Sequence, residues 1–385
     1  MEKIEKIVKT VKCFFPHQSE ISLHEPCLLD EDIQAVADCV RSGFVSSVGE
    51  HVGKFEEKLC EFTGAKNCVV VSSGTVAIQV ALEVLGVQPG DYVITQNLTF
   101  IATANAIANV GAIPIFVDVQ RNDGCLCPIS LANWIEANTF RDCEGFTRHR
   151  RTTKKISAIV PVHILGNSID LEKLSSISEQ NNIPLIEDAA EALGSKFNGE
   201  FIGSGSNAAC ISFNGNKIIT TGGGGAIFFN SYEYARRAKK LTTTAKIPHE
   251  YEFFHDARAY NYRLPNLNAC LGLSQLNKLP EILELKTALA IEYQKLFQDI
   301  SLQYVHGEHY SRSNHWLNAV IMNSFEDRNK LLKKCISNNI FARPFWGLLS
   351  EQRIYKEHLQ SDNLENSKYL YERVVCLPSS VHIDR

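Results

Sequence analysis

The sequence from Ser212 to Gly225 reads SFNGNKIITTGGGG, and it follows a short apolar run that is typical of a buried strand. Lys217 lies in this stretch beside Ile218 and Ile219, which is not the usual setting of a solvated lysine, although a surface lysine is the simpler alternative. A lysine removed from water is deprotonated more readily and becomes a nucleophilic amine that forms Schiff bases. The stretch therefore predicts a reactive lysine just beyond a buried strand.

The sequence around this lysine alternates short β-branched runs with helical patterns. We expect strands at Cys68–Ser72, Tyr92–Thr95, Pro114–Asp118, Ile156–Val162, Ile183–Glu187, Ala209–Phe213 and Ala226–Phe229. We expect helices at Val76–Leu85, Ala102–Val110, Leu131–Ala137 and Leu171–Gln180. Apolar strands that alternate with helices indicate an α/β fold, with a mostly parallel sheet covered by helices on both faces.

The length of 385 residues favours two domains. We predict an N-terminal amphipathic segment at residues 1–20, a large domain at 21–264 and a smaller α+β domain at 265–385. The smaller domain should begin with two helices, Leu267–Leu279 and Ile282–Phe297, separated at Pro280. The N-terminal segment places apolar residues on one helical face and lysines around the other, so it either docks on protein or lies on a membrane surface.

Composition narrows the functional classes. A net charge of -4 argues against a nucleic-acid partner, and no apolar run approaches the ~20 residues that span a membrane. The twelve cysteines have no repeated spacing, which indicates reduced thiols of a cytoplasmic protein. Cys125 and Cys127 are close in sequence, but no second pair of cysteines with suitable spacing accompanies them, so we expect no metal site. We interpret the basic segment Arg141–Lys155 as a solvated surface loop, with phosphate binding as the alternative. His306, His309 and His315 lie among Gly, Glu and Ser and indicate an exposed connection.

Two further groups of polar residues follow expected strands. The first, Ser72–Thr75, provides either a helix cap or free N–H groups for a phosphate, with Gly74 allowing close approach of a ligand. The second, Glu187-Asp188, is either the cap of a helix over Ala189–Leu193 or the partner of a protonated heterocycle nitrogen. Ligands in open α/β sheets bind at the carboxyl ends of the strands. A phosphate cradle, an acid and Lys217 at that edge match the requirements of pyridoxal 5'-phosphate (PLP).

With these residues identified, the chain from about residue 21 onward resembles the DegT/StrS sugar-nucleotide aminotransferases, which belong to the fold type I PLP-dependent enzymes. The resemblance depends on several stretches in the family's order. They are Gly43–Gly49 (GFVSSVG), Ser73–Thr75, Thr99–Asn105 (TFIATAN), Pro161–His163, Glu187–Glu191 (EDAAE), Ser212–Gly225 and Tyr260–Leu264 (YNYRL).

The resemblance implies a role for each matching position. Lys217 is the catalytic Schiff-base lysine, and Asp188 is the partner of the pyridine nitrogen. The other implied cofactor-binding residues are Ser73, Gly74, Thr75, Phe100, Glu191, Ser212 and Asn261. The implied substrate-binding residues are Ser46, Ser47, His163, Arg263 and Arg343. Without the resemblance, His163 is interpreted equally well as a core histidine. Glu191 departs from the glutamine or histidine that the family usually places near the ring hydroxyl. Asn261 matches a residue that reaches the neighbouring subunit's cofactor, which implies a homodimer with shared sites.

The family implies transfer of the amino group of glutamate to a nucleotide-linked keto sugar. The stretches Ser212–Gly225 and Leu241–Lys246 look most similar to the branch that aminates UDP-2-acetamido-4-keto-6-deoxyhexose, on routes to legionaminic acid and bacillosamine. GDP- or dTDP-linked 4-keto or 3-keto sugars are alternatives. A PLP-dependent sugar dehydratase would carry histidine in place of Lys217, and a non-catalytic PLP-binding regulator would lack the substrate loop Gly43–Gly49. A nucleotide-dependent oxidoreductase should show Gly-x-Gly-x-x-Gly after the first strand, which Ser72–Thr75 does not.

Overall fold

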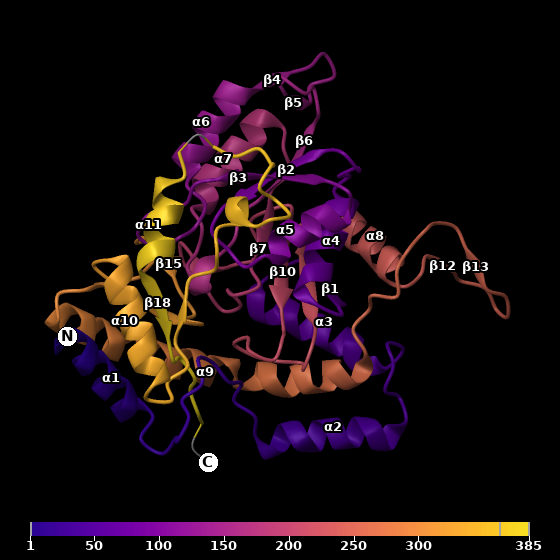
Figure 1. Ribbon diagram of the computed structural model, residues 1–385. Helices are drawn as coiled ribbons and strands as arrows, with labels where there is room; N and C mark the ends of the chain where they lie inside the picture. The colour runs from indigo at the N-terminus through magenta and orange to yellow at the C-terminus, as the bar shows by residue number, and fades with distance from the viewer. Residues whose placement is uncertain (1, 362, 384–385) are drawn as a thin grey trace.

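Two sheets lie edge to edge at the centre of the computed structural model, which describes residues 2–361 and 363–383 (Figure 1). The first sheet has the order β1-β11-β10-β7, and the second has the order β3-β2-β6. The strands are β1 (Asn67–Val71), β2 (Tyr92–Gln96), β3 (Ile113–Val117), β6 (Ile156–Val160), β7 (Ile186–Asp188), β10 (Ala208–Ser212) and β11 (Gly225–Phe229). Parallel bridges from Ile159 to Leu185 and from Val162 to Asp188 join β6 to β7. Strand β11 is antiparallel to both of its neighbours, while the other pairs are parallel.

Helices cover both faces because both sets of strand side chains are apolar. In β1, Val69 and Val71 pack with helices α4 (Gly74–Val84) and α8 (Tyr232–Thr242), while Val70 packs with α3 (Glu50–Thr63) and α9 (Asn266–Asp299) on the opposite face. Helix α5 (Ala102–Asn109) lies beside α4, and α6 (Pro128–Asn138) and α7 (Leu171–Asn181) cover the second sheet. These elements confirm the predicted fold class, and their bounds fall within a few residues of the predicted ones.

The C-terminal part forms a second layer of sheet and helices. Its sheet has the order β14-β16-β18-β17. Its elements are β14 (Gln303–Tyr304), β16 (Asn318–Ile321), α10 (Phe325–Ile336), β17 (Arg343–Pro344), η2 (Leu349–Glu351), α11 (Glu365–Arg373) and β18 (Val374–Leu377). Helix α1 (Glu2–Phe14) buries Ile4, Ile7, Val8 and Val11 against this layer, in one apolar cluster with Tyr293 and Leu331. Docking on protein is therefore the correct interpretation of the N-terminal helix.

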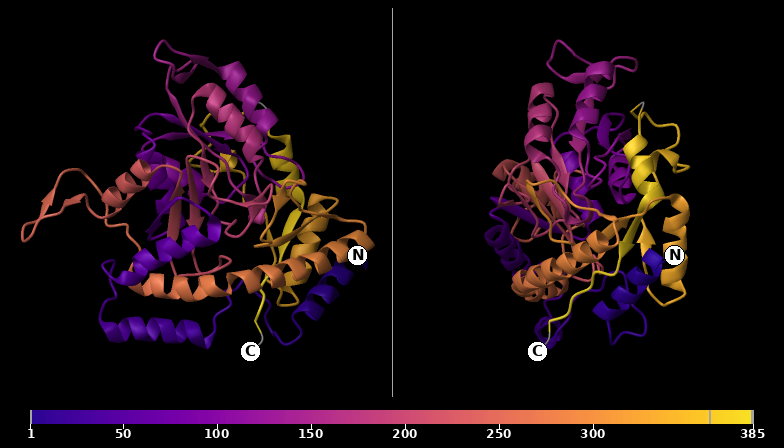
Figure 2. Two further views of the ribbon diagram at one scale, coloured as in Figure 1. Left: turned by 180° about the vertical axis from the view of Figure 1, so that it is seen from behind. Right: turned by 90° about the vertical axis from the view of Figure 1, so that its left-hand side faces the viewer.

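Several short elements complete the chain. They are α2 (Asp30–Ser42), η1 (Ile164–Gly166), β8 (Lys196–Phe197), β9 (Glu200–Phe201) and β15 (Ser311–Arg312). The strands β12 (Lys246–Ile247) and β13 (Phe254–His255) form a hairpin that extends away from the body of the molecule, and we call residues 246–255 the arm (Figures 1 and 2).

The structure corrects two predictions about local structure. The break at Pro280 is wrong, because α9 is continuous from Asn266 to Asp299 with Pro280 inside it. Its first half packs under the central sheet and its second half packs with the C-terminal layer, so tertiary contacts on both sides outweigh the hydrogen bond that the proline removes. The surface loop at Arg141–Lys155 is a hairpin of β4 (Thr139–Arg141) and β5 (Thr147–His149). His149 is buried there and stacks on Trp134.

The predicted domain boundary at residue 264 stays a prediction. Helix α9, which follows this boundary, contributes residues to the core of the central sheet and to the core of the C-terminal layer. No helix among the described residues is long and apolar enough to cross a membrane. Within residues 2–361 and 363–383, no group of three or more His, Cys, Asp or Glu side chains could hold a metal ion.

Candidate active site

A cavity of about 390 Å³ lies at the carboxyl ends of the parallel strands. Its volume falls within the range of small-molecule sites. Eight predicted residues line it: Ser73, Gly74, Thr75, Phe100, Asp188, Glu191, Ser212 and Lys217. They come from the ends of β1, β2, β7 and β10, which run in the same direction, with β11 between β1 and β10 and β6 between β7 and β2. The structure therefore brings together the predicted cofactor residues, with the exception of Asn261.

Asp188 ends β7 and is almost completely buried. Its Oδ2 accepts a hydrogen bond of 2.6 Å from the Thr103 hydroxyl, and its Oδ1 accepts one of 3.2 Å from the Ala190 N–H. Burial raises the pKa of Asp188, and these hydrogen bonds together with the charge of Lys217 counteract that rise. A turn follows Asp188, so the alternative of a helix cap over Ala189–Leu193 is wrong. The carboxyl group is instead fixed at the cavity wall.

Lys217 lies in the loop after β10, with only 13% of its side chain exposed. Its Nζ is 3.7 Å from Oε1 of Glu191 and 4.0 Å from the ring centre of Trp316. Trp316 is held in turn by a 2.7 Å hydrogen bond from its indole N–H to the Asn216 carbonyl. The simpler alternative of a solvated surface lysine is therefore wrong. The amine is enclosed, and it points to the same cavity as Asp188.

The turn between β1 and α4 fits a phosphate group. The Ser73 hydroxyl caps α4 by accepting the Val76 N–H, so the capping interpretation is correct and the N–H groups of the first turn remain for a ligand. A Cβ on Gly74 would approach the Ser212 Cβ to 2.8 Å, which is closer than real contacts allow. Glycine is therefore needed to leave room between Gly74 and Ser212. With Asp188 and Lys217 in the same cavity, this space suits a phosphorylated heterocyclic aldehyde.

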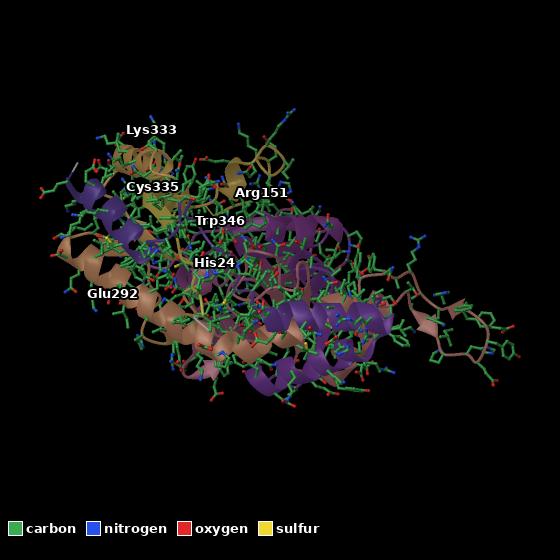
Figure 3. All side chains as sticks on the ribbon, turned by 90° about the horizontal axis from the view of Figure 1, so that it is seen from below. His24, Arg151, Glu292, Lys333, Cys335 and Trp346 are labelled. Atoms are coloured by element: carbon green, nitrogen blue, oxygen red, sulfur yellow. The ribbon has the colours of Figure 1, made fainter. Side chains whose placement is uncertain are left out.

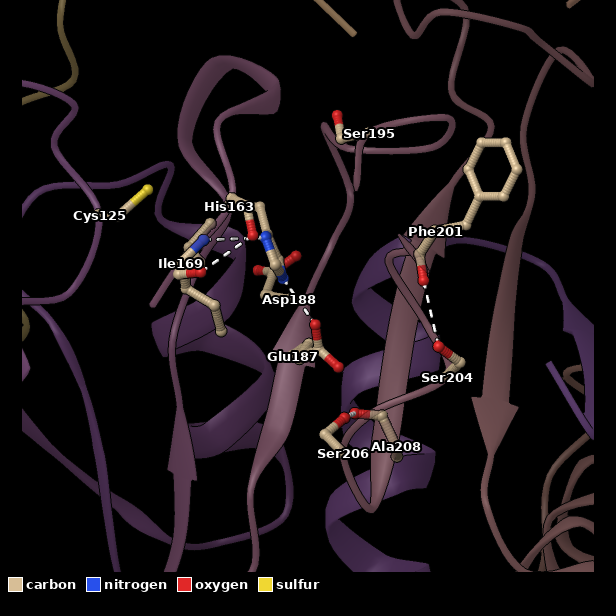
Figure 4. A network of polar contacts seen from close by, with 12 residues as sticks. Cys125, His163, Ile169, Glu187, Asp188, Ser195, Phe201, Ser204, Ser206 and Ala208 are labelled. Atoms are coloured by element: carbon tan, nitrogen blue, oxygen red, sulfur yellow. Dashed lines mark hydrogen bonds and ion pairs between the residues drawn. The ribbon is translucent and has the colours of Figure 1, made fainter. Parts of the chain in front are cut away.

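His163 is fully buried and is not among the residues that line the cavity. Figure 4 shows its side chain beside Ile169 and Glu187. Its Nδ1 accepts the Ile169 N–H at 3.3 Å, so its Nε2 carries the proton and donates to Glu187 Oε2 at 2.9 Å. Its backbone N–H also donates to the Asp188 carbonyl at 3.0 Å. Both ring nitrogens are therefore used inside the protein, as expected for a core histidine, and a contact of His163 with the substrate stays a prediction. His163 supports the strand that carries Asp188.

The remaining predicted residues lie away from the cavity of this chain. Asn261 is exposed and pairs with Thr243 near the base of the arm. Ser46 and Ser47 lie in the loop after α2, and Arg343 is exposed on β17. Arg263 bridges to the end of β1, and its Nε is buried without a hydrogen-bond partner among the described residues. Their roles toward a ligand stay predictions.

Sequence reasoning missed three contributors. Thr103 anchors Asp188, while Trp316 and Trp346 line the cavity from the C-terminal layer. Thr103 had a usable signal, since it lies in the first turn of a helix that follows a strand end. Trp316 had no such signal, because it follows a stretch rich in Gly, Glu and Ser that is typical of an exposed connection. His315 is in fact partly buried, and that burial lowers its pKa to about 4.

The fold and the cavity together define a PLP-dependent transferase of fold type I. The chain belongs to the DegT/DnrJ/EryC1/StrS aminotransferase family, whose model matches residues 26–385. It is 31% identical to GDP-perosamine synthase of Vibrio cholerae over 93% of this chain and 94% of that protein. It is 33% identical to GDP-perosamine synthase of Escherichia coli O157:H7 over 93% of both chains.

A solved structure supports the same assignment. Helicobacter pylori PseC, an aminotransferase of pseudoaminic acid biosynthesis, superposes with a TM-score of 0.83 at 26% identity. The match covers 93% of both chains. The chain is therefore a PLP-dependent aminotransferase, and the cavity provides the residues that can hold the cofactor.

Proposed function

We propose that this enzyme transfers the amino group of glutamate to the keto carbon of a nucleotide-linked sugar. The observation that carries the proposal is a single cavity that is lined by Lys217, Asp188 and the Gly74 turn, together with Trp316 and Trp346. The aromatic rings offer flat apolar surfaces to a sugar ring. Two GDP-perosamine synthases among the relatives and the likeness to PseC support a sugar nucleotide as the acceptor.

The predicted cofactor residues have distinct parts in this reaction. The first turn of α4 and Ser212 would hold the cofactor's phosphate, and Phe100 would lie beside its ring. PLP, when bound, supplies an electron-accepting ring for transfer of the amino group. Asp188, whose position is fixed by Thr103, would hold a proton at the ring nitrogen. Lys217 would bind the cofactor covalently at rest and move a proton at its Nζ during turnover.

For the acceptor, we propose UDP-2-acetamido-4-keto-6-deoxyhexose, which gives a 4-amino sugar nucleotide for surface glycan or nonulosonic acid synthesis. This choice depends on the resemblance of Ser212–Gly225 and Leu241–Lys246 to that branch. A GDP-linked 4-keto sugar is the second candidate, because the two GDP-perosamine synthases are 31% and 33% identical to this chain.

We further propose that the enzyme works as a homodimer with shared sites. Among the described residues that line the cavity, Lys217 is the single cation, whereas a nucleotide diphosphate needs positive partners when it is buried. Tyr251 and Phe253 in the arm are each 76% exposed. The arm itself extends away from the body of its own chain (Figure 3). Exposed aromatic side chains of this kind are typical of protein interfaces. Asn261 lies near the base of the arm and is available to a neighbouring cavity.

The substrate proposal is tested with a panel of UDP-, GDP- and dTDP-linked 4-keto and 3-keto sugars, each incubated with glutamate. Mass spectrometry of the products should show an amino sugar with the UDP-linked 4-keto acceptor. Product from the GDP-linked sugar alone would support the second candidate. If no member of the panel gained an amino group, the proposed function would be wrong.

The dimer proposal is tested by mixing two inactive variants, Lys217→Ala and Asn261→Ala. If Asn261 serves the neighbouring cavity, a mixed dimer contains one site with both residues intact. Activity should then reappear on mixing and increase with the time allowed for subunit exchange. Two Lys217→Ala chains carrying different tags provide the control. Failure to recover activity in dimers shown to contain both variants would contradict a shared site.

A further inference from the structure

Glu191 is held in the cavity by contacts on several sides. Its Oε2 accepts a 2.8 Å hydrogen bond from the Leu165 N–H, and its backbone carbonyl accepts one of 2.9 Å from Asn314 Nδ2. These contacts fix the side chain so that Oε1 faces Lys217, with 3.7 Å between Oε1 and Nζ. The nearest charged neighbour of the reactive amine is therefore a carboxyl group with a fixed position.

The hydrogen bond to Glu191 comes from a strained residue. Leu165 has φ 54° and ψ 18°, a left-handed conformation that is unfavourable for an L-residue with a side chain. Its side chain is almost fully buried, so this conformation is set by packing and not by a flexible loop. Strain of this kind is concentrated at functional sites. Here its visible result is an N–H group directed at the Glu191 carboxylate.

The surroundings of Glu191 favour uncharged forms. Only 4% of the Glu191 side chain and 13% of the Lys217 side chain are exposed. The other groups that face Glu191 are the Asp188 carboxyl group and the thiols of Cys125 and Cys376. Burial raises the pKa of both thiols, so they carry no charge near neutral pH. Burial also raises the pKa of Glu191 to about 7, against the opposing effect of Lys217.

We propose that Glu191 and Lys217 share one proton and that Glu191 thereby controls when the lysine amine is free. In the exchange, one N–H bond of the Lys217 ammonium breaks, and an O–H bond forms on Glu191 Oε1. The electron pair stays on the nitrogen, and the net charge of the pair remains zero. Because both forms are neutral overall, a dry cavity stabilises the uncharged amine and acid relative to two separated charges. The inference rests on the proposed role of Lys217 as the reactive amine.

The inference is tested by following the reactivity of Lys217 in the full-length enzyme freed of cofactor. Trace labelling with acetic anhydride, quantified by mass spectrometry of the Lys217 peptide, reports the fraction of uncharged amine at each pH. In the wild type, two coupled groups should give a rise in two steps. Glu191→Gln keeps an acceptor for the Leu165 N–H but cannot take a proton. Its labelling should rise in a single step and be about tenfold faster near neutral pH, as expected for the loss of one adjacent anion.

A matched pair elsewhere in the chain provides the control. Glu56 also accepts a backbone N–H, from Val70 at 3.1 Å, and pairs with Lys239 at 2.8 Å, but 45% of the Lys239 side chain is exposed. Glu56→Gln should leave the labelling of Lys217 unchanged. Glu191→Asp retains a carboxyl group and should retain two steps, which provides a second test if the glutamine variant folds poorly.

Identical profiles for wild type and Glu191→Gln, or a single step in the wild type, would overturn the inference. Neither result depends on a sugar substrate. If wild type and Glu191→Gln give the same profile and the enzyme transfers amino groups, the proton-sharing proposal is wrong and the proposed function stands. If the two profiles differ but no amino group is transferred, the proton-sharing proposal stands and the proposed function is wrong.

Discussion

Two lysine–glutamate pairs in this chain have similar contacts and different surroundings. Glu191 with Lys217 and Glu56 with Lys239 each combine a buried carboxylate, a backbone N–H and a lysine amine. The lysine is enclosed under Trp316 in the first pair, but its side chain is 45% exposed in the second. Water reaches Lys239, whereas Lys217 is enclosed between Trp316 and Glu191. The comparison predicts that enclosure, and not the pairing itself, distinguishes a reactive lysine from a structural one.

The strongest test of this comparison removes each lysine in turn. Lys217→Ala should lower the rate of amine transfer by about 10⁴-fold, because a positioned proton-transfer group and the covalent anchor of the cofactor are lost together. Lys239→Ala should change the rate by less than about twofold, since an exposed ion pair contributes less than about 1 kcal/mol. Steady-state assays with glutamate and the accepted keto sugar measure both values. Similar losses for the two variants would show that enclosure has no role.

A second test concerns the buried hydrogen bond between His163 and Glu187. His163→Ala should lower the free energy of unfolding by about 3–5 kcal/mol, because Glu187 is left buried without its partner. Replacing both residues with leucine should recover a large part of this loss, since no buried carboxyl group then lacks its hydrogen-bond partner. Denaturant unfolding of the cofactor-free variants provides the measurement. A double variant as unstable as the single one would contradict the argument.

A smaller effect is expected where charge changes and shape does not. Asp188→Asn keeps an oxygen that can accept the Thr103 hydroxyl hydrogen bond but cannot carry the charge that attracts a proton to the ring nitrogen. The kcat for amine transfer should decrease by about 10²-fold, within the range for loss of one electrostatic contact. Far-UV circular dichroism should be unchanged. A wild-type kcat in the Asp188→Asn enzyme would show that amine transfer does not need the charge of this residue.

The smallest expected effect is the pH dependence of stability. The folded protein holds the pKa of Glu191 near 7, above its usual value of 4.5, so the folded state binds the extra proton between these values. This contribution to stability is complete below about pH 4.5 and is lost as the pH rises through about 7, with a slope of at most about 1.4 kcal/mol per pH unit. Glu191→Gln should remove that part of the slope in unfolding experiments on cofactor-free protein. The Glu56→Gln control should retain it.

The sequence was sufficient to predict the elements of the central sheet and the residues at their carboxyl ends. Lys217, Asp188 and Gly74 could be predicted because each follows a short apolar run, and parallel strands bring their ends together. Trp316 could not be found in this way, since its place at the cavity depends on how the C-terminal layer packs on the central sheet. The family resemblance predicts a substrate contact for His163, whereas the structure buries its side chain completely. The preference of proline for helix ends predicts a break at Pro280, but packing along both halves of α9 keeps the helix continuous.

Helix α9 connects the two cores of the molecule. Its 34 residues extend about 50 Å, from the region below Lys217 to the layer that carries Trp316. A continuous helix cannot stretch, so the layer can approach or leave the ligand only if the helix pivots or bends. The backbone bends most easily where a hydrogen bond is missing, which in this helix is at Pro280. The residue that was expected to end a helix is thus the point of α9 at which bending costs least.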